Sequence, residues 1–388
     1  MEYLKNIEKA IQQTSQAWTP PPNLKISDWA DAYRKLSPES SAEAGSWRTD
    51  RAPYQREIMD AFNNPDIQRI VFMKSAQVGA TEILLNVIGY YIDQDPSPML
   101  VMQPTLQMGQ AFSKDRLSTM IRDSEKIRNC VKDPRSRDSG NTVLSKKFAG
   151  GNLNIVGSNS ASGLASRPIR IVLADEVDRY EASAGSEGDP ISLATKRTTT
   201  FWNKKIYLCS TPTVKGLSRI ETAFEESDKR YYHVPCPECN VKQVLKWKNV
   251  VWDENKPETA AYACNECGTI INESKKQWML KHGEWIASES KSDTAGFHIS
   301  ELYSVWSTWA DMAKSFLEAK KQPEMLKTWI NTALGESWEE QGETIEHEEL
   351  LERRLNYDSE TIPEDVLVLT AGVDTQKDRL ELQMVGWG

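Results

Sequence analysis

Apolar residues along this chain gather in short runs that end in small or charged residues. Residues 70–73 form one such run, and the small-residue loop after it leads into a helical pattern over 82–91. A strand, a loop and a helix are therefore predicted in that order. Similar apolar runs at 99–103, 171–174 and 205–209 predict further strands. Strands that alternate with helices indicate an α/β domain built on a parallel sheet.

The loop after the first strand has the size and composition of a phosphate-binding loop. Gly79 and Thr81 fit the second glycine and the metal-binding hydroxyl of the pattern G-x-x-x-x-G-K-[ST], but Ala80 occupies its lysine position. Lys74 stands where the first glycine would be, and a lysine there can reach the β- and γ-phosphates of ATP. We expect Ser75, the next residue of the loop, to bind the nucleotide as well. Backbone N–H groups at the start of the helix would hold phosphate oxygens. The alternative is an ordinary strand–turn–helix with a chance lysine.

The strand over 171–174 ends in two adjacent carboxylates. Asp175 is placed to bind Mg²⁺ through water, and Glu176 to orient and deprotonate the attacking water. A later strand end carries hydroxyls at Ser210 and Thr211 that can sense the γ-phosphate, although a simple turn is the alternative there. Taken in order, the three elements predict a nucleotide-binding core that uses ATP and Mg²⁺.

Four of the six cysteines form two C-x₂-C pairs that are separated by 24 residues. This spacing suits a zinc ribbon with four thiolate ligands in tetrahedral geometry, namely Cys236, Cys239, Cys264 and Cys267. Four cysteine ligands leave no open position for catalysis, so Zn²⁺ would have a structural role. Disulfide bonds are the alternative, and they are disfavoured in a cytosolic protein.

Composition is typical of a multidomain cytosolic protein. The 388 residues favour two or three domains, and a hydrophobic content of 39% with 13 tryptophans supplies a core. No apolar stretch approaches the roughly 20 residues of a membrane span, and the N-terminus lacks the order of a signal peptide. We therefore expect no membrane partner.

The net charge of −9 does not decide whether the chain binds nucleic acid. Acidic residues concentrate in one run over 336–365, whereas basic clusters lie elsewhere, at 114–116, 132–137, 146–147 and 196–205. Local patches rather than the total charge govern contacts with phosphate. The total charge therefore does not exclude DNA as a partner.

Several motifs in a fixed order resemble the large terminase subunit of tailed phages, in its lambda GpA-like branch. They lie at 47–49, 53–59, 74–79 and 174–179, and the cysteine pairs follow them. The resemblance covers nearly the whole chain. It implies an ATPase that packages double-stranded DNA into a procapsid, working as a homo-oligomeric ring on the portal in the host cytoplasm. It also implies a small terminase subunit as partner and a C-terminal nuclease with an RNase H-like fold.

The same resemblance suggests roles for residues that no pattern singles out. Tyr54 and Gln55 match the segment that contacts adenine. In such motors an arginine shortly before the Walker B strand reaches a neighbouring subunit's γ-phosphate, and Arg167 is the first candidate, with Arg170 in reserve. Asp374 matches the first metal-binding carboxylate of the nuclease. The sequence ends fourteen residues later, so the further carboxylates of a two-metal site are missing and nuclease activity is expected to be absent.

The combined prediction is an ASCE or RecA-like P-loop NTPase sheet with helices on both faces. A small zinc-ribbon insertion and the first hairpin of a truncated RNase H-like domain are expected in addition. The expected segments are an N-terminal helical segment that contacts the small subunit (1–45), the ATPase core (46–228), the zinc ribbon (229–274), a helical and acidic linker region (275–362) and the start of the nuclease domain (363–388).

Two other functions stay open at this point. The chain could be a helicase or another DNA translocase, although no second set of RecA-like motifs follows the first half. It could instead be a non-catalytic assembly subunit with a degenerate phosphate loop and a structural zinc. Ala80 favours that alternative, and the intact pair of Asp175 and Glu176 opposes it. Substitution of Lys74 separates the two, because a non-functional loop does not need its lysine.

Overall fold

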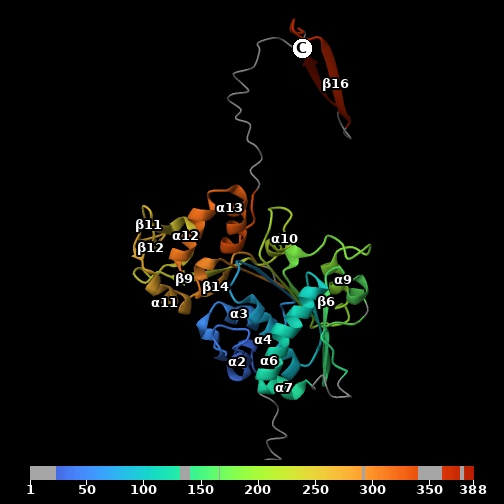
Figure 1. Ribbon diagram of the computed structural model, residues 1–388, viewed down its shortest axis with the longest axis vertical. Helices are drawn as coiled ribbons and strands as arrows, with labels where there is room; N and C mark the ends of the chain where they lie inside the picture. Colours follow the sequence, from blue (N-terminus) through green and yellow to red (C-terminus); the bar gives the residue numbers. More distant parts are fainter. Residues whose placement is uncertain (1–22, 132–139, 166, 291–292, 340–360, 376–379) are drawn as a thin grey trace, which may run out of the picture. The chain divides into compact units, whose positions relative to one another are not determined.

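The computed structural model describes residues 23–131, 140–165, 167–290, 293–339, 361–375 and 380–388. The chain divides into two compact units, Met1–Glu339 and Glu340–Gly388, and each is described by itself (Figure 1). Residues 1–22 of the predicted N-terminal segment and residues 340–360 of the predicted acidic linker lie outside the described part. Within the described ranges, every helix is too short or too polar to traverse a lipid bilayer.

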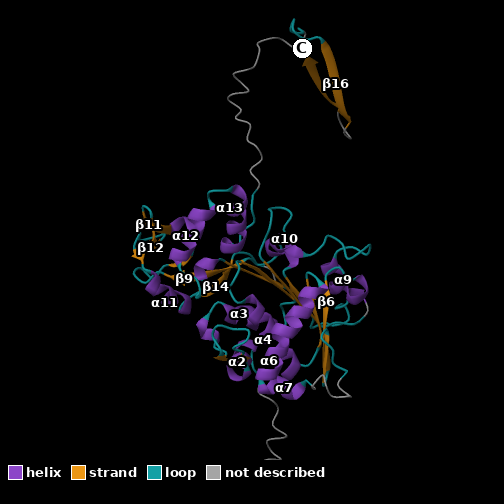
Figure 2. Ribbon diagram, in the orientation of Figure 1, coloured by secondary structure: helices purple, strands orange, loops and turns teal. Residues whose placement is uncertain are grey.

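A ten-stranded sheet forms the centre of the larger unit (Figure 2). Its strands are β3 (Arg69–Lys74), β4 (Pro98–Gln103), β5 (Ser145–Phe148), β6 (Gly151–Gly157), β7 (Ile171–Asp175), β8 (Lys205–Ser210), β9 (Arg230–Pro235), β10 (Lys242–Val244), β14 (Glu284–Ala287) and β15 (Thr294–Ile299). They lie in the order β10-β9-β15-β3-β8-β7-β4-β6-β5, and β14 pairs with β9. From β9 to β6 each strand is parallel to its neighbours, whereas β5, β10 and β14 pair in antiparallel fashion.

Successive residues of the central strands point to opposite faces of the sheet, and both faces are buried. In β3, Ile70 and Phe72 belong to one hydrophobic core, while Val71 and Met73 belong to the other. The first core includes residues of α2 (Ile26–Tyr33), α3 (Gln55–Asp60), α4 (Ala80–Asp93), α6 (Ser118–Asp123) and α7 (Glu125–Cys130). The second includes residues of α8 (Ala161–Ala165), α9 (Pro190–Lys196) and α10 (Arg219–Glu225). Burial on both faces explains why these strands are almost wholly apolar, and the predicted α/β architecture is present.

The sheet contains several strands that the sequence analysis did not predict, among them β5, β6, β14 and β15. Both β14 and β15 come from the region 275–362, which was expected to be helical and acidic. β15 lies between β9 and β3, with Ile299 opposite Lys74. A Cβ on its Gly296 would lie 1.8 Å from Ser227 Oγ, so this close approach requires a glycine. Because glycine weakens the sequence signal of a strand, the six-residue β15 escaped the pattern.

The remaining elements of the larger unit form a small sheet and a set of helices. The sheet consists of β11 (Val250–Asp253), β12 (Lys256–Ala263) and β13 (Ile270–Ile271). Helices α11 (Lys276–Lys281), α12 (Trp309–Ala319) and α13 (Pro323–Trp329), with the π-helical turn η8 (Ile330–Leu334), confirm the predicted helices near 275–280, 309–321 and 325–334. Trp247 links the two parts, because its ring centroid lies 5.8 Å from Trp252 of β11, 5.2 Å from Phe316 of α12 and 4.8 Å from Trp329 of α13.

The smaller unit contains a two-stranded antiparallel hairpin. Its strands are β16 (Val368–Thr375) and β17 (Leu380–Trp387), and Val368 pairs with Trp387 at the open end. The hairpin confirms the two strands predicted for this part of the sequence.

Backbone contacts from late in the chain hold the loop that follows β3. The N–H of Ser75 donates to the carbonyl of Ile299 at 2.9 Å, and the N–H of Ala76 donates to the carbonyl of Thr332 at 2.7 Å. Gly335 has a φ of +65°, and a Cβ added to it would lie 2.7 Å from both Lys74 C and Ser75 N. The end of β15, η8 and the glycine after η8 therefore hold the backbone of this loop in place.

Gly335→Ala tests this support, with Gly216→Ala as its matched control. Both glycines have positive φ, but nothing lies within 4 Å of a Cβ on Gly216. Left-handed strain of about 1–2 kcal/mol is expected in both variants. Gly335→Ala should lose roughly 1–3 kcal/mol more, because the new methyl group collides with backbone atoms that cannot easily move. Urea unfolding of the two variants measures the difference, and equal losses would contradict the close approach.

Candidate active site

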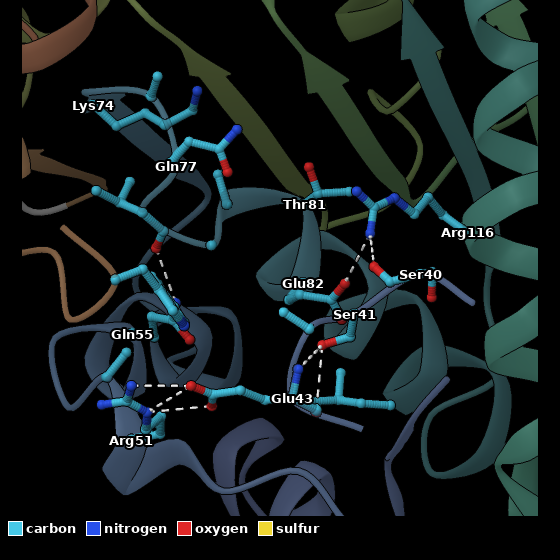
Figure 3. Close-up of a pocket in the computed structure, with 18 of the residues that line it drawn as sticks. Ser40, Ser41, Glu43, Arg51, Gln55, Lys74, Gln77, Thr81, Glu82 and Arg116 are labelled. Atoms are coloured by element: carbon cyan, nitrogen blue, oxygen red, sulfur yellow. Dashed lines mark hydrogen bonds and ion pairs between the residues drawn. The ribbon is translucent and has the colours of Figure 1, made fainter. Parts of the chain in front are cut away.

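A cavity of about 600 Å³ opens beside the carboxyl ends of the central parallel strands. Open α/β sheets bind ligands at that edge. Lys74 and the loop after β3 form one wall, and Glu176 and Thr211 come from the ends of β7 and β8. Residues between Ser40 and Gln55 form part of another wall, together with Arg116 (Figure 3). Trp306 and Thr332, from beyond β15, also line the cavity.

The loop after β3 reaches helix α4 through a residue that must be glycine. Gly79 has a φ of +82° and precedes the first helical residue, Ala80. A Cβ on Gly79 would lie 2.2 Å from Gln55 Nε2. Gln55 Nε2 in turn donates to the carbonyl of Val78 at 2.9 Å, and the Tyr54 hydroxyl donates to the same carbonyl at 3.3 Å. Tyr54 and Gln55 therefore fix the shape of the loop.

Only one of these two side chains faces the cavity. Gln55 is among the lining residues, while Tyr54 is fully buried beneath the loop and is not. Gln55 Oε1 is buried and has no hydrogen-bond partner within the described ranges. A buried acceptor without a donor is costly unless a ligand supplies one.

Lys74 and Glu176 form an ion pair between the ends of β3 and β7. Lys74 Nζ lies 3.0 Å from Glu176 Oε1, and the lysine side chain is only 7% exposed. Burial opposes the charged form of Lys74, but neighbouring Cys209, Glu176 and Asp175 raise the pKa of its ammonium above the ordinary value. The structure therefore brings together the two residues to which the sequence assigned the cation and the base.

Glu176 adopts an uncommon backbone conformation. Its φ of 54° lies in the left-handed region, which residues other than glycine, asparagine and aspartate seldom adopt. Such strain concentrates at functional sites, where surrounding contacts enforce it. The turn directs the Glu176 side chain into the cavity, directly after the buried strand β7.

Asp175 lies behind Glu176 at the last position of β7. Gln103 Nε2, from the end of β4, donates to Asp175 Oδ2 at 3.2 Å. Burial and then the charge of Glu176 raise the pKa of the Asp175 carboxyl above its ordinary value, against the pull of Lys74. A divalent cation at this point would favour the charged carboxylate again. Sequence patterns did not find Gln103, whose only signal is its position at a strand end.

The hydroxyls at the end of β8 occupy different places. Ser210 is buried, donating to the Thr211 carbonyl at 2.8 Å and accepting from the N–H of Asp178 at 3.3 Å. Thr211 lines the cavity. Asp178 also accepts from the Thr213 hydroxyl at 2.9 Å and from the N–H of Ile220 at 2.8 Å. Asp178, which the sequence reading did not select, thus ties the ends of β7 and β8 to helix α10.

Neither arginine selected before β7 lines this cavity. Arg167 is exposed and donates to Asn154 Oδ1 at 2.9 Å. Arg170 holds Asp95 with two hydrogen bonds of 2.8 and 2.7 Å. The arginines that do line it are Arg48, Arg51, Arg116 and Arg179. Figure 3 shows Arg116 beside Glu82 and Arg51 paired with Glu43.

The remaining lining residues include the predicted metal-binding hydroxyl. Thr81 occupies the second position of α4 and faces the cavity, and Ala80 lines it beside Gly79. Ser75 is buried, and its hydroxyl has no hydrogen-bond partner among the described residues. The loop residues named from the sequence therefore gather around one cavity.

The four paired cysteines converge at a separate place. Their sulfur atoms all lie within 4.8 Å of one another, so the group can hold a metal ion. Cys236 directly follows β9, and Cys264 directly follows β12. Each begins a tight turn. The N–H of Asn240 donates to the backbone carbonyl of Cys236, and the N–H of Gly268 donates to the backbone carbonyl of Cys264. The two turns bring residues from distant parts of the sequence together.

Asp374 lies on β16 of the smaller unit. The hairpin register places it directly opposite Glu381 of β17. Residues at paired positions share one face of a hairpin, so two carboxylates are neighbours there.

Comparisons with known proteins identify the family. The model described as "Phage terminase large subunit gpA, ATPase domain" matches residues 41–285. The model described as "Terminase large subunit gpA, endonuclease domain" matches residues 294–388. The chain therefore belongs to the phage terminase large subunit gpA family, which confirms the resemblance found in its sequence.

Individual relatives agree with this assignment. The large terminase subunits of Enterobacteria phage P21 and Escherichia phage lambda are 33% and 31% identical over 397 and 396 residues, which cover 95% of this chain. The chain spans 61% of the length of each.

Similar solved structures include two large terminases. The ATPase domain from Thermus phage P74-26 matches with a TM-score of 0.43 and 12% identity, covering 74% of this chain and 96% of that one. The large terminase from a second, thermophilic bacteriophage matches with a TM-score of 0.30 and 15% identity, covering 42% of this chain and 39% of that one.

A double-mutant cycle on Lys74→Met and Glu176→Gln tests the central ion pair. Either change alone leaves a poorly solvated charge, so the coupling free energy of unfolding should be about 1–3 kcal/mol. The pair of Lys215 and Glu339, at 3.2 Å but 59% and 73% exposed, is the control. Its coupling should stay below about 0.5 kcal/mol in the same urea titrations. Similar couplings in both pairs would contradict the burial of the central one.

Proposed function

We propose that this chain is the ATP-hydrolysing part of a motor that packages double-stranded DNA into a viral procapsid. The observation that carries the proposal is the contact of Lys74 with Glu176 in the wall of a cavity of about 600 Å³. Membership of the terminase family supplies the biological context. The strand order adds support, because β8 separates β3 from β7 and places a hydroxyl between the lysine and the two carboxylates.

Each residue of the site has a role in this proposal. Lys74 neutralises the β- and γ-phosphates, and Thr81 with Asp175 holds Mg²⁺. Bound Mg²⁺ would relieve the unfavourable burial of the Asp175 carboxylate, and Gln103 orients it. Glu176 orients the attacking water and takes its proton, because its side chain lines the cavity. Thr211 and Ser210 sense the γ-phosphate, because they link the cavity to Asp178 and α10.

The absence of a lysine at Ala80 is compatible with this chemistry. Lys74 leaves β3 at the opposite end of the loop, yet it lines the same cavity as Ala80 and Thr81. One cation in the phosphate region is sufficient for the electrostatic part of the reaction. Burial of Lys74 beside Glu176, whose backbone is strained, is unfavourable for stability and therefore argues against a loop that has lost its function.

Two further assignments concern the nucleotide and the neighbouring subunit. Gln55 would offer its unpaired Oε1 to a donor group on the base, and Tyr54 acts only through the loop. Arg167 would complete the site of an adjacent subunit in a ring, since it is exposed and does not line the cavity of its own chain. An arginine supplied in trans adds roughly 10³ to 10⁵ to the rate of hydrolysis.

Zn²⁺ is the proposed occupant of the cysteine cluster. A Zn–S bond of about 2.3 Å in a tetrahedron separates neighbouring sulfur atoms by about 3.8 Å. The distances from Cys236 Sγ to Cys267 Sγ and from Cys239 Sγ to Cys264 Sγ are both 3.8 Å. Such a ribbon would fix the small sheet that packs on α12.

The remaining partners follow from the family. They are double-stranded DNA, a small terminase subunit, the portal of the procapsid and further copies of this chain in a ring. Asp374, with Glu381 opposite, would bind a metal ion as part of a nuclease site. These assignments place the protein in the host cytoplasm.

Substitutions of the ion pair should separate binding from hydrolysis. Lys74→Ala should weaken MgATP binding at least tenfold and abolish turnover, because it removes the phosphate cation. Glu176→Gln should keep MgATP affinity within about threefold while lowering turnover at least a hundredfold, because only the base is lost. Calorimetry and phosphate release measure the two quantities, with Lys215→Ala as the control. Unchanged binding and no wild-type turnover would favour the non-catalytic alternative.

Removal of the cluster's metal should loosen the ribbon without emptying the ATP site. The purified protein should contain one equivalent of Zn²⁺, and Cys264→Ser should lose it and unfold at lower temperature. Cys130→Ser, outside the cluster, should retain both metal and stability. Metal analysis and thermal unfolding provide the readouts, and full zinc content in Cys264→Ser would contradict the assignment.

A further inference from the structure

A tryptophan from far along the chain forms part of the wall of the ATP cavity. Trp306 follows β15 and the short helix η7 (Glu301–Tyr303), and 46% of its surface is exposed. A Cβ on Gly79 would lie 3.5 Å from Trp306 Cη2, so the outer edge of the indole lies against the phosphate loop. The hydrophobic cores do not use this ring.

Hydrogen bonds hold the backbone on either side of the peptide bond between Val305 and Trp306. The N–H of Trp306 donates to Ser304 Oγ at 3.2 Å, and the carbonyl of Val305 accepts from Arg51 Nη2 at 3.4 Å. Arg51 in turn donates to the Glu43 carboxylate at 2.9 Å, and this hydrogen bond is the largest cause that lowers the pKa of Glu43. The backbone before Trp306 is thus tied to Glu43 through Arg51, and the edge of its indole lies beside Gly79.

We infer that Trp306 is the stacking platform for the base of the bound nucleotide. The inference rests on the proposed function, since it concerns the same cavity. A nucleotide whose phosphates bind at the start of α4 would have its base elsewhere in the same cavity, and Trp306 is an exposed aromatic ring in the wall of that cavity. Tyr54, the residue that the sequence suggested for contact with adenine, is fully buried and cannot stack on a ligand.

A second polar group beside the platform defines which base fits. Gln55 also contacts Gly79, and its buried Oε1 lacks a donor within the described part of the chain. An exocyclic amino group, such as that of adenine, can donate to this oxygen, whereas a base with a carbonyl there cannot. Stacking on Trp306 would then provide affinity, and Gln55 would provide the preference for adenine.

Binding of MgATP and of magnesium tripolyphosphate, which lacks the base, tests the inference by calorimetry. Trp306→Ala should weaken MgATP binding about 5- to 100-fold, the range of base stacking on aromatic side chains. The same variant should bind tripolyphosphate as the wild type does. Trp306→Phe should recover most of the ATP affinity, because a smaller ring still stacks. Trp202→Ala is the control, since this tryptophan is 80% exposed and lies outside the cavity lining.

The outcomes distinguish this inference from the proposed function. Equal weakening of both ligands in Trp306→Ala would mean that the indole only shapes the phosphate loop, which overturns the inference. Unchanged MgATP affinity in that variant, or equal wild-type affinities for the two ligands, also overturns it. Failure of the wild-type protein to bind either ligand would instead remove the nucleotide site itself.

Discussion

The contact between the Lys74 ammonium and the Glu176 carboxylate joins the end of β3 to the end of β7 past the end of β8. It places a cation and a base 3.0 Å apart in a partly enclosed region, where electrostatic interactions are stronger than in water. The neighbouring groups reinforce this arrangement. Asp175 adds a second carboxylate beside the lysine, and Gln103 and Asp178 fix the strand ends that carry these groups. The groups that could bind a phosphate, a metal ion and an attacking water therefore lie close together around Lys74 and Glu176.

The geometry of that point depends on residues far away in sequence. The carbonyls of Ile299 and Thr332 receive the N–H groups of Ser75 and Ala76, and Gly335 lies against the same backbone. The segment that follows β15 also brings Trp306 to the cavity. The part of the chain that was predicted to be a helical and acidic linker region thus contributes to the cavity that is proposed to bind ATP. A shift of that segment would therefore act directly on the loop after β3, which is the coupling that the proposed motor function needs.

The sequence predicted those elements whose conformation is determined by a short segment of the chain. The apolar run before Lys74, the glycine at 79 and the paired carboxylates gave β3, α4, β7 and their site, because buried parallel strands and tight loops impose composition on short segments. The C-x₂-C pairs predicted the convergence of four cysteines for the same reason. β15 was missed because Gly296 lowers the strand propensity of its segment, and the reason for this glycine, the close approach of Ser227, is visible only in the fold. Trp306 and Gln103 were missed because only the fold brings them to the cavity.

The dependence of ATP hydrolysis on protein concentration, measured for the wild-type chain with and without duplex DNA, tests the central claim most directly. The account predicts Mg²⁺-dependent turnover per subunit that rises with concentration, because Arg167 of one copy completes the site of the next. Mixing Glu176→Gln subunits with Arg167→Ala subunits, each inactive alone, should restore part of that turnover. Absence of hydrolysis at every concentration would contradict the account, since the pair of Lys74 and Glu176 would then serve structure alone.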